Sequence, residues 1–228
     1  MITIAFVVII ITYTCYKYKQ EKSKKWYVIE GNIGSGKSTV LDYIKNKHGD
    51  KIEIIKEPID VWNKVYDDKG NSVFELFCKD PQKYSYIFQY FVFQTRIRSC
   101  DHPQLTKLRF SERSVLTDRH VFMKSMIKKK FISYIEYNCY MELYDWLVSK
   151  FKKPDGIIYL KTDFNICYDR KNIRSRKGEE TVDIDYLKLI HDNHEEWLNK
   201  DNSIPIFIVD GNDTLENIYN KINEKFII

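Results

Sequence analysis

Gly31-Asn32-Ile33-Gly34-Ser35-Gly36-Lys37-Ser38-Thr39 contains the phosphate-binding pattern G-x-x-x-x-G-K-[ST] in its first eight residues. The glycines let backbone N–H groups turn inward around phosphates, and a helix that follows offers its positive N-terminus. Lys37 is expected to reach the β- and γ-phosphates, and the Ser38 hydroxyl to bind Mg²⁺. The pattern also arises by chance in turns. Here an apolar run precedes it and a helical pattern follows it, which predicts a triphosphate-binding loop.

Apolar runs and helical patterns alternate along the rest of the chain. The expected strands are residues 26–30, 52–56, 110–113, 156–161 and 204–210. The expected helices are residues 38–47, 81–98, 133–151, 163–174, 184–199 and 215–226. Strands that are apolar throughout and separated by helices predict a five-stranded parallel sheet in an α/β, three-layer αβα fold. In such sheets ligands bind at the carboxyl ends of the strands.

Composition bounds the class of protein. The 228 residues are 43% hydrophobic and 30% charged, which predicts a folded globular domain. The formal net charge of +5 is modest, so we expect anionic small-molecule ligands and no nucleic-acid polymer as partner. The five cysteines are scattered without a CxxC pair, which predicts neither a zinc site nor a disulfide framework.

The N-terminal segment differs from the remainder. Residues 2–15 are almost wholly apolar and lysines follow them. The run is shorter than the roughly 20 residues of a spanning helix, and its basic residues stand on the wrong side for a cleaved signal peptide. We divide the chain into residues 1–25, an apolar segment with a lysine-rich linker, and a domain at 26–228. The expected location is the cytoplasm. Residues 2–18 are either a membrane tether, an extra strand, or a tail from an upstream start codon.

Several segments together resemble the deoxynucleoside kinase family, which includes the deoxycytidine, deoxyguanosine and insect multisubstrate kinases. The resemblance begins at Ile29-Glu30 with the phosphate-binding loop and extends from residue 26 to about the C-terminus. The other matching segments are Glu57-Pro58 with Trp62, Lys79-Asp80-Pro81, Phe88-Gln89, Arg96-Ile97-Arg98, Glu112-Arg113-Ser114, Asp118-Arg119, Arg170, Arg174, Arg176, Glu179 and the run at 194–198. The family implies transfer of the γ-phosphate of ATP or another triphosphate to a deoxynucleoside 5′-hydroxyl in nucleotide salvage. It also implies Mg²⁺ and a homodimer packed through long helices.

The residues that follow the second and third strands are candidates for the chemistry. Glu57 comes just after the second strand, at the ligand-binding edge, where a carboxylate can act as general base for a hydroxyl. Its alternative role is a capping carboxylate before Pro58. Glu112 is expected to hold Mg²⁺ directly or through water, and Arg113 to bind a phosphate or hold the base. A buried structural ion pair is the alternative role for these residues.

Arg170, Arg174 and Arg176 predict a mobile lid over the phosphates. Arginines that close over a transferring phosphoryl group stabilise its equatorial oxygens, although an exposed basic helix face is more often solvated surface. The resemblance implies that Arg170 stacks on the nucleotide base and that Glu179 contacts the sugar.

The long helix at 81–98 carries the candidate base-recognition residues. A glutamine amide can pair with a base edge in two directions, and the resemblance implies that Gln89 contacts the base. The resemblance implies that Trp62, Phe88 and Phe122 line the pocket, although Phe88 alone is equally typical of a core aromatic. Val92 lies on the same helix, and small differences beneath the base shift preference.

Arg96 and Asp118 match the polar pair of the deoxycytidine and deoxyguanosine branch, which implies preference for deoxycytidine or deoxypurines over thymidine. Cys78 is a departure, because the family usually has a tyrosine there that bonds the sugar 3′-hydroxyl. Tyr84 or Tyr86 is a candidate substitute for that tyrosine, and looser sugar selection is the alternative.

Two other functions remain open from the sequence. A thymidylate-type nucleoside monophosphate kinase shares the loop and an Asp-Arg element, here Asp118-Arg119, but needs extra cations for its phosphorylated acceptor. Glu57 favours a neutral hydroxyl acceptor instead. A membrane-tethered nucleotide-binding protein without turnover is the second rival.

Overall fold

The structure is a computed structural model that describes residues 23–200 and 203–227. Its five strands are all parallel and lie in the order β2-β3-β1-β4-β5. They are β1 (Lys25–Glu30), β2 (Ile52–Ile55), β3 (Leu108–Glu112), β4 (Gly156–Lys161) and β5 (Ile206–Asp210). The predicted fold class, a P-loop αβα sandwich with a five-stranded parallel sheet, is confirmed.

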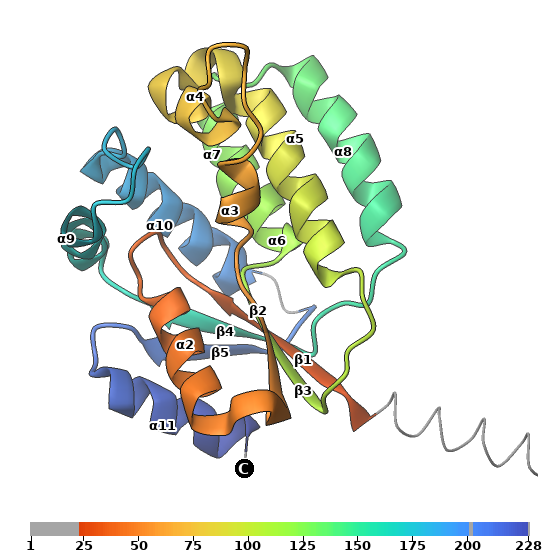
Figure 1. The fold of residues 1–228 in the computed structure, drawn as a ribbon, viewed down its shortest axis with the longest axis vertical. Helices are drawn as coiled ribbons and strands as arrows, with labels where there is room; N and C mark the ends of the chain where they lie inside the picture. Colours follow the sequence, from red (N-terminus) through yellow and green to blue (C-terminus); the bar gives the residue numbers. More distant parts are fainter. Residues whose placement is uncertain (1–22, 201–202, 228) are drawn as a thin grey trace, which may run out of the picture.

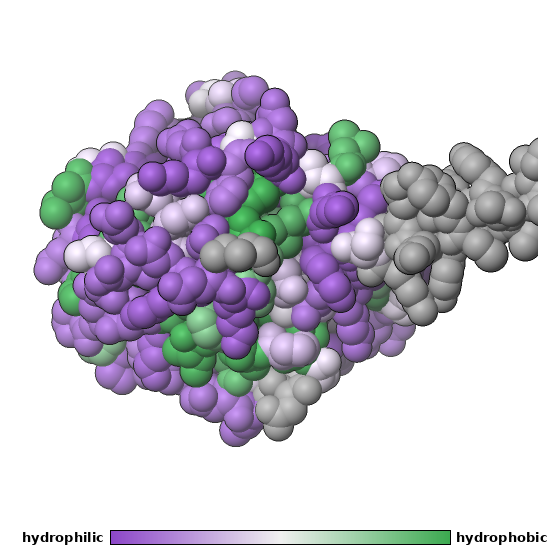
Figure 2. Space-filling view, turned by 90° about the horizontal axis from the view of Figure 1, so that it is seen from below, coloured by the Kyte–Doolittle hydropathy of each residue, from purple (hydrophilic) through white to green (hydrophobic). Residues whose placement is uncertain are grey.

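Helices cover both faces of this sheet (Figure 1). On one face, α2 (Lys37–His48) and α11 (Leu215–Phe226) pack their apolar sides on the strands, and Ile44, Phe110 and Ile222 are fully buried between them. On the other face lie α5 (Pro81–Cys100), α8 (Tyr134–Val148) and α10 (Ile184–Lys200). The polar sides of the outer helices give the largely hydrophilic surface in Figure 2.

Short helices account for most of what the sequence analysis did not assign. They are η1 (Gly49–Lys51), α3 (Ile59–Trp62), α4 (Val73–Lys79), α6 (Val115–Thr117), the π-helix η2 (Asp118–Met123) and α7 (Lys124–Lys128). Most are too short to show a helical period. An available signal was the capping box of α4, in which Ser72 and Glu75 cap each other.

Element boundaries differ from the expected ones by a few residues. The fifth strand begins at Ile206 instead of residue 204, because Pro205 has no N–H to give to a ladder. Its carbonyl still accepts from Ile157 N, at 2.8 Å. The helix α9 (Phe164–Arg174), expected from residue 163, uses the Asp163 side chain as its N-cap.

The expected N-terminal tether, residues 2–18, lies outside the described residues. No helix within 23–200 and 203–227 has both the length and the apolar character needed to cross a membrane.

Candidate active site

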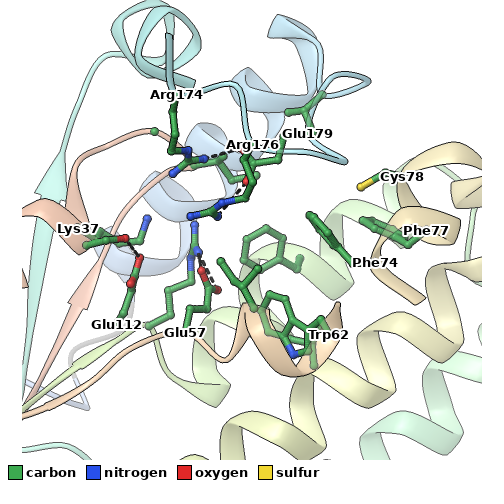
Figure 3. Close-up of a pocket in the computed structure, with 18 of the residues that line it drawn as sticks. Lys37, Glu57, Trp62, Phe74, Phe77, Cys78, Glu112, Arg174, Arg176 and Glu179 are labelled. Carbon is green, nitrogen blue, oxygen red and sulfur yellow. Dashed lines mark hydrogen bonds and ion pairs between the residues drawn. The ribbon is translucent and has the colours of Figure 1, made fainter. Parts of the chain in front are cut away.

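A cavity of about 410 Å³ lies at the carboxyl edge of the sheet. The loop after β1 carries Lys37 to it, the chain after β2 carries Glu57, and the end of β3 carries Glu112 and Arg113. Figure 3 shows Lys37, Glu57 and Glu112 at one end of the cavity and the rings of Trp62, Phe74 and Phe77 at the other. Arg174, Arg176 and Glu179 lie above them. The topology of a parallel sheet therefore brings together side chains that are far apart in the sequence.

The phosphate-binding loop is shaped by its backbone. Gly34 has a φ of 80°, and a Cβ at this position would lie 2.2 Å from the Cys167 carbonyl oxygen. Only glycine fits such a site, since a side chain would be strained and would clash with backbone. The loop residues that line the cavity are Ile33, Gly34, Gly36, Lys37, Ser38 and Thr39.

The remaining loop residues support the loop from behind. The Asn32 side chain donates to the Leu187 carbonyl at 2.9 Å, and Ser35 is buried. The Gly31 carbonyl accepts from Arg113 at 3.3 Å. These three residues, expected to bind the donor, are not among those that line the cavity.

Lys37 and Ser38 begin α2 and face the cavity. Lys37 is buried, and its ammonium donates to the Asn32 carbonyl at 2.7 Å. Burial lowers the pKa of Lys37 to about 8, and the neighbouring Arg113 adds to the effect. The Ser38 hydroxyl donates to Glu112 Oε1 at 2.8 Å. A hydroxyl and a carboxylate side by side form the hard oxygen donor set that Mg²⁺ prefers.

Glu57 is held by two arginines. Arg113 Nη1 donates to both carboxylate oxygens, at 2.8 and 2.7 Å, and Arg96 Nη2 donates to Oε1 at 3.0 Å. Burial pushes the pKa of Glu57 up, but Arg113, Arg96 and Lys37 outweigh it and hold the pKa at about 2. Glu57 is thus ionised, pre-oriented and exposed to the cavity it lines. It does not cap a helix, because the N-cap of α3 is Pro58.

Arg113 adopts an unusual backbone conformation to reach Glu57. Its φ is 60°, a left-handed value that costs a non-glycine residue about 1–3 kcal/mol. The Arg113 N–H donates to the Ile29 carbonyl at 3.0 Å, which fixes the turn at the end of β3. Arg113 therefore forms a buried ion pair with Glu57, whereas Glu112 accepts from the Ser38 hydroxyl.

Arg96 joins this pair to a second buried carboxylate. Its Nε donates to Asp118 at 2.9 and 3.0 Å, and its Nη1 to the Glu112 carbonyl at 3.3 Å. Burial raises the pKa of Asp118, although Arg96 opposes that shift. Asp118 is fully buried behind Arg96 and does not line the cavity, so any influence on a ligand passes through the guanidinium.

The far end of the cavity is aromatic. Phe77 and Phe88 stack with centroids 4.4 Å apart, and Trp62 meets Phe88 edge-on at 5.7 Å. Among the described residues no hydrogen-bond partner reaches Gln89 Oε1, which is buried in a side chain that lines this end. Flat rings with one unpaired amide oxygen suit a planar, hydrogen-bonding ligand such as a nucleobase. Val92 and Phe122 complete the expected lining.

The sequence analysis missed several lining residues. They are Ile59, Phe74, Phe77, Val182 and Tyr186. Tyr84 and Tyr86, the expected substitutes for the missing tyrosine, do not line the cavity, whereas Cys78 and Tyr186 do. Burial raises the pKa of the Cys78 thiol to about 12, so it stays neutral and is a weak donor.

The end of α9 and the segment after it carry the predicted lid. Arg174 and Arg176 both pair with Glu179, the latter at 3.1 Å, and all three line the cavity. Arg170 lies lower and donates to the Gly211 carbonyl at 3.0 Å and more weakly to the Ser35 carbonyl at 3.4 Å. The arginines therefore face the site and not only solvent.

Comparison with known proteins agrees with this geometry. The chain is 36% identical to a probable deoxycytidine kinase of Fowlpox virus (strain NVSL), over 87% of this chain and 88% of the relative. It is 32% identical to deoxycytidine kinase 2 of Gallus gallus, over 88% and 86% of the two chains. It is also 32% identical to the mitochondrial thymidine kinase 2 of Homo sapiens, over 82% and 70%. The sequence model described as deoxynucleoside kinase matches residues 27–227, and the chain therefore belongs to the deoxynucleoside kinase family of phosphotransferases.

Proposed function

We propose that the protein transfers the γ-phosphate of ATP to the 5′-hydroxyl of a deoxynucleoside, with deoxycytidine or a deoxypurine favoured over thymidine. The observation that carries this proposal is the shared cavity. The Glu57 carboxylate lines the same cavity of about 410 Å³ as Lys37 and Ser38, and Arg113 bonds both Glu57 and the loop carbonyl of Gly31. A phosphate held by the loop and a hydroxyl held by Glu57 would be neighbours in it.

The proposed reaction is a single phosphoryl transfer. The 5′-oxygen forms a bond to the γ-phosphorus while the bond from that phosphorus to the bridging oxygen of ADP breaks. The hydroxyl proton passes to Glu57. Since arginines hold the pKa of Glu57 at about 2, this carboxylate is a weak base that orients the hydroxyl and takes its proton late. A late proton transfer fits the loose transition state of phosphoryl transfer, in which positioning matters most.

The donor end has the residues for ATP and Mg²⁺. We assign the phosphates to the loop backbone and Lys37, and the metal to Ser38 and Glu112. Magnesium would neutralise part of the triphosphate charge. Arg174 and Arg176 are assigned to the transferring phosphoryl group. Each bonds Glu179 through one nitrogen, so its other N–H groups can donate to phosphate oxygens. Arg170, at the Gly211 carbonyl, is assigned to the base of the donor.

The acceptor end supports the base preference. Gln89 offers an unpaired buried amide oxygen, and Arg96 lines the cavity with its charge balanced by Asp118. We assign Trp62, Phe88, Val92 and Phe122 to the base and Glu179 to the sugar. An arginine beside the base, held by Asp118 behind it, leaves less room for the 5-methyl group of thymine than an apolar side chain would.

A homodimer is proposed through α5 and α8. These helices lie side by side in Figure 1, and both expose large apolar side chains. Those side chains are Ile87, Tyr90, Tyr134, Ile135 and Trp146. Exposed apolar surface of this kind is typical of a protein interface. Sedimentation analysis should find a dimer that Ile87→Glu dissociates.

A substrate panel tests the reaction. ADP release from ATP is measured with each of the four deoxynucleosides and with their monophosphates, with and without Mg²⁺. We expect turnover with deoxycytidine or a deoxypurine, weaker turnover with thymidine, and none with a monophosphate. Turnover with monophosphates alone would identify a nucleoside monophosphate kinase, and no turnover with any acceptor would leave only nucleotide binding.

A further inference from the structure

Lys171 is a buried lysine that the proposed chemistry does not use. It lies in α9 and is only 3% exposed. Its ammonium donates to two backbone carbonyls, those of Val182 at 2.8 Å and Glu179 at 3.1 Å, and lies 5.0 Å from the Tyr168 ring centroid. Within the part of the chain that the structure describes, no carboxylate pairs with it.

Burying the Lys171 ammonium without a carboxylate partner costs free energy unless its hydrogen bonds stabilise a specific structure. An ammonium loses its hydration on burial, and without a counter-charge only hydrogen bonds and the ring offset that loss. Charge-assisted bonds to carbonyls are strong, and here both end in one segment, residues 179–182. Lys171 therefore acts on the backbone of the lid, one helical turn before Arg174.

The chain bends sharply between α9 and the lid residues that Lys171 holds. Ser175 and Gly178 have φ values of 47° and 92°. A Cβ on Gly178 would lie 3.0 Å from the Phe74 ring, and Thr181 Oγ1 donates to the Cys78 carbonyl at 3.0 Å. The lid is thus seated on α4 on one side and tied to α9 by Lys171 on the other.

Glu179 is the lid residue whose position these contacts of Lys171 and α4 fix. Its backbone carbonyl is bonded to Lys171, while its carboxylate, 9% exposed, is bonded to both Arg174 and Arg176. Figure 3 shows the three side chains converging above Glu57 and Lys37. A shift of the Glu179 backbone would move the carboxylate that orients both arginines.

We propose that Lys171 is a positioning residue of the kinase: it fixes the backbone at Glu179 and Val182 so that the Glu179 carboxylate sets Arg174 and Arg176 over the cavity. Its effect on turnover rests on the proposed function. Its effect on the lid does not.

The test compares Lys171→Met with Lys188→Met. Lys188 is an exposed lysine of α10 that forms an i,i+4 pair with Asp192. We expect Lys171→Met to lower kcat about ten- to a hundredfold, since two bonds from a charged donor are lost. ATP affinity should stay at the wild-type value, because the phosphate-binding loop is untouched. Lys171→Arg, which keeps a cationic donor, should recover part of the loss.

A double-mutant cycle separates positioning from mere stabilisation. If Lys171 acts through Glu179, then Lys171→Met should change kcat little in a Glu179→Gln background. If the two substitutions lower kcat independently, so that their fold-losses multiply in the double variant, the proposal is overturned. An unchanged kcat in Lys171→Met alone would overturn it as well. If Lys171→Met does not fold, Lys171→Gln, which is shorter and uncharged, enters the same cycle.

Limited trypsin digestion keeps this inference distinct from the proposed function. Cleavage after Arg174, Arg176 and Lys177 should be faster in Lys171→Met than in wild type and Lys188→Met at equal thermal stability. Unchanged cleavage would overturn the role of Lys171. Absence of turnover in the wild type would instead contradict the proposed function while leaving the digestion result valid.

Discussion

The two ends of the cavity are built in different ways. The phosphate end is made by consecutive loop residues whose backbone provides the binding groups, and Gly34 has its place because no side chain fits there. The acceptor end is made by side chains from α3, α4, α5, η2 and α10, held by buried charges such as Arg96 and Asp118. We therefore expect changes at the phosphate end to affect the rate, and changes at the acceptor end to affect stability and specificity as well.

Arg96→Met should give the largest effect, a loss of about 3–5 kcal/mol in the free energy of unfolding. The substitution leaves Glu57 and Asp118 buried without their shared partner. Urea unfolding measures it, with Arg98→Met, an exposed arginine of the same helix, as control. Equal free energies of unfolding for the two variants would show that the acceptor end does not depend on buried charge.

Lys37→Met should act in the opposite manner. We expect the rate to fall about 10²–10³-fold, the usual loss for one electrostatic donor to a transition state. The free energy of unfolding should not fall, because a buried ammonium with a pKa lowered to about 8 is replaced by an apolar chain. Lys45→Met on the exposed side of the same helix is the control. A strongly destabilised Lys37→Met would contradict this expectation and would mean that the bond from the Lys37 ammonium to the Asn32 carbonyl stabilises the loop.

Glu30 is the last residue of β1, directly before the phosphate-binding loop, and its ionisation should be visible in the pH dependence of stability. It is fully buried at the end of β1 and accepts from Ser114 Oγ at 3.0 Å. Burial raises its pKa from 4.5 to about 7, against the opposing effects of Thr117, Arg113 and Ser114. Because the folded-state pKa is raised, the stabilising contribution of the protonated group is complete below pH 4.5 and is lost as pH rises through 7.

Glu30→Gln should therefore gain stability relative to wild type as pH rises. The difference between the two proteins should change by up to about 3 kcal/mol in favour of Glu30→Gln between pH 4.5 and 8. Unfolding of both proteins across this range measures it, and other titrating groups cancel in the comparison. A difference that does not vary with pH would place the Glu30 pKa near its ordinary value.

Cys78→Tyr should give the smallest effect. If a sugar hydroxyl lacks a donor there, the added phenol should lower the KM for the deoxynucleoside about two- to tenfold, the value of one hydrogen bond. Cys78→Phe supplies the ring without the hydroxyl. A Cβ added at Gly178 would lie 3.6 Å from the Cys78 sulfur. A higher KM for Cys78→Tyr would therefore show that the lid needs the space that the larger side chain fills.

The same contrast explains what could be predicted from sequence. The loop, the alternation of strands and helices, and Glu57 after β2 were accessible, because contiguous motifs and periodicity encode them. Phe74, Phe77 and Tyr186 were not, because only the packing of short helices turns them toward the cavity. Asp118 was assigned to the ligand, yet it lies behind Arg96, and no sequence pattern distinguishes a residue that touches a ligand from one that holds its neighbour. Lys171 belongs to no recognisable sequence motif, so its role could not be predicted from the sequence.

The most direct test of the account is the paired measurement of ATP affinity and deoxynucleoside-dependent ADP release in wild type and Glu57→Gln. In Glu57→Gln we expect unchanged ATP affinity and a rate of ADP release lowered about 10²–10⁴-fold, because the glutamine fills the same space but takes no proton. Turnover at the wild-type rate in Glu57→Gln would contradict it, since another group would then have to receive the proton of the hydroxyl.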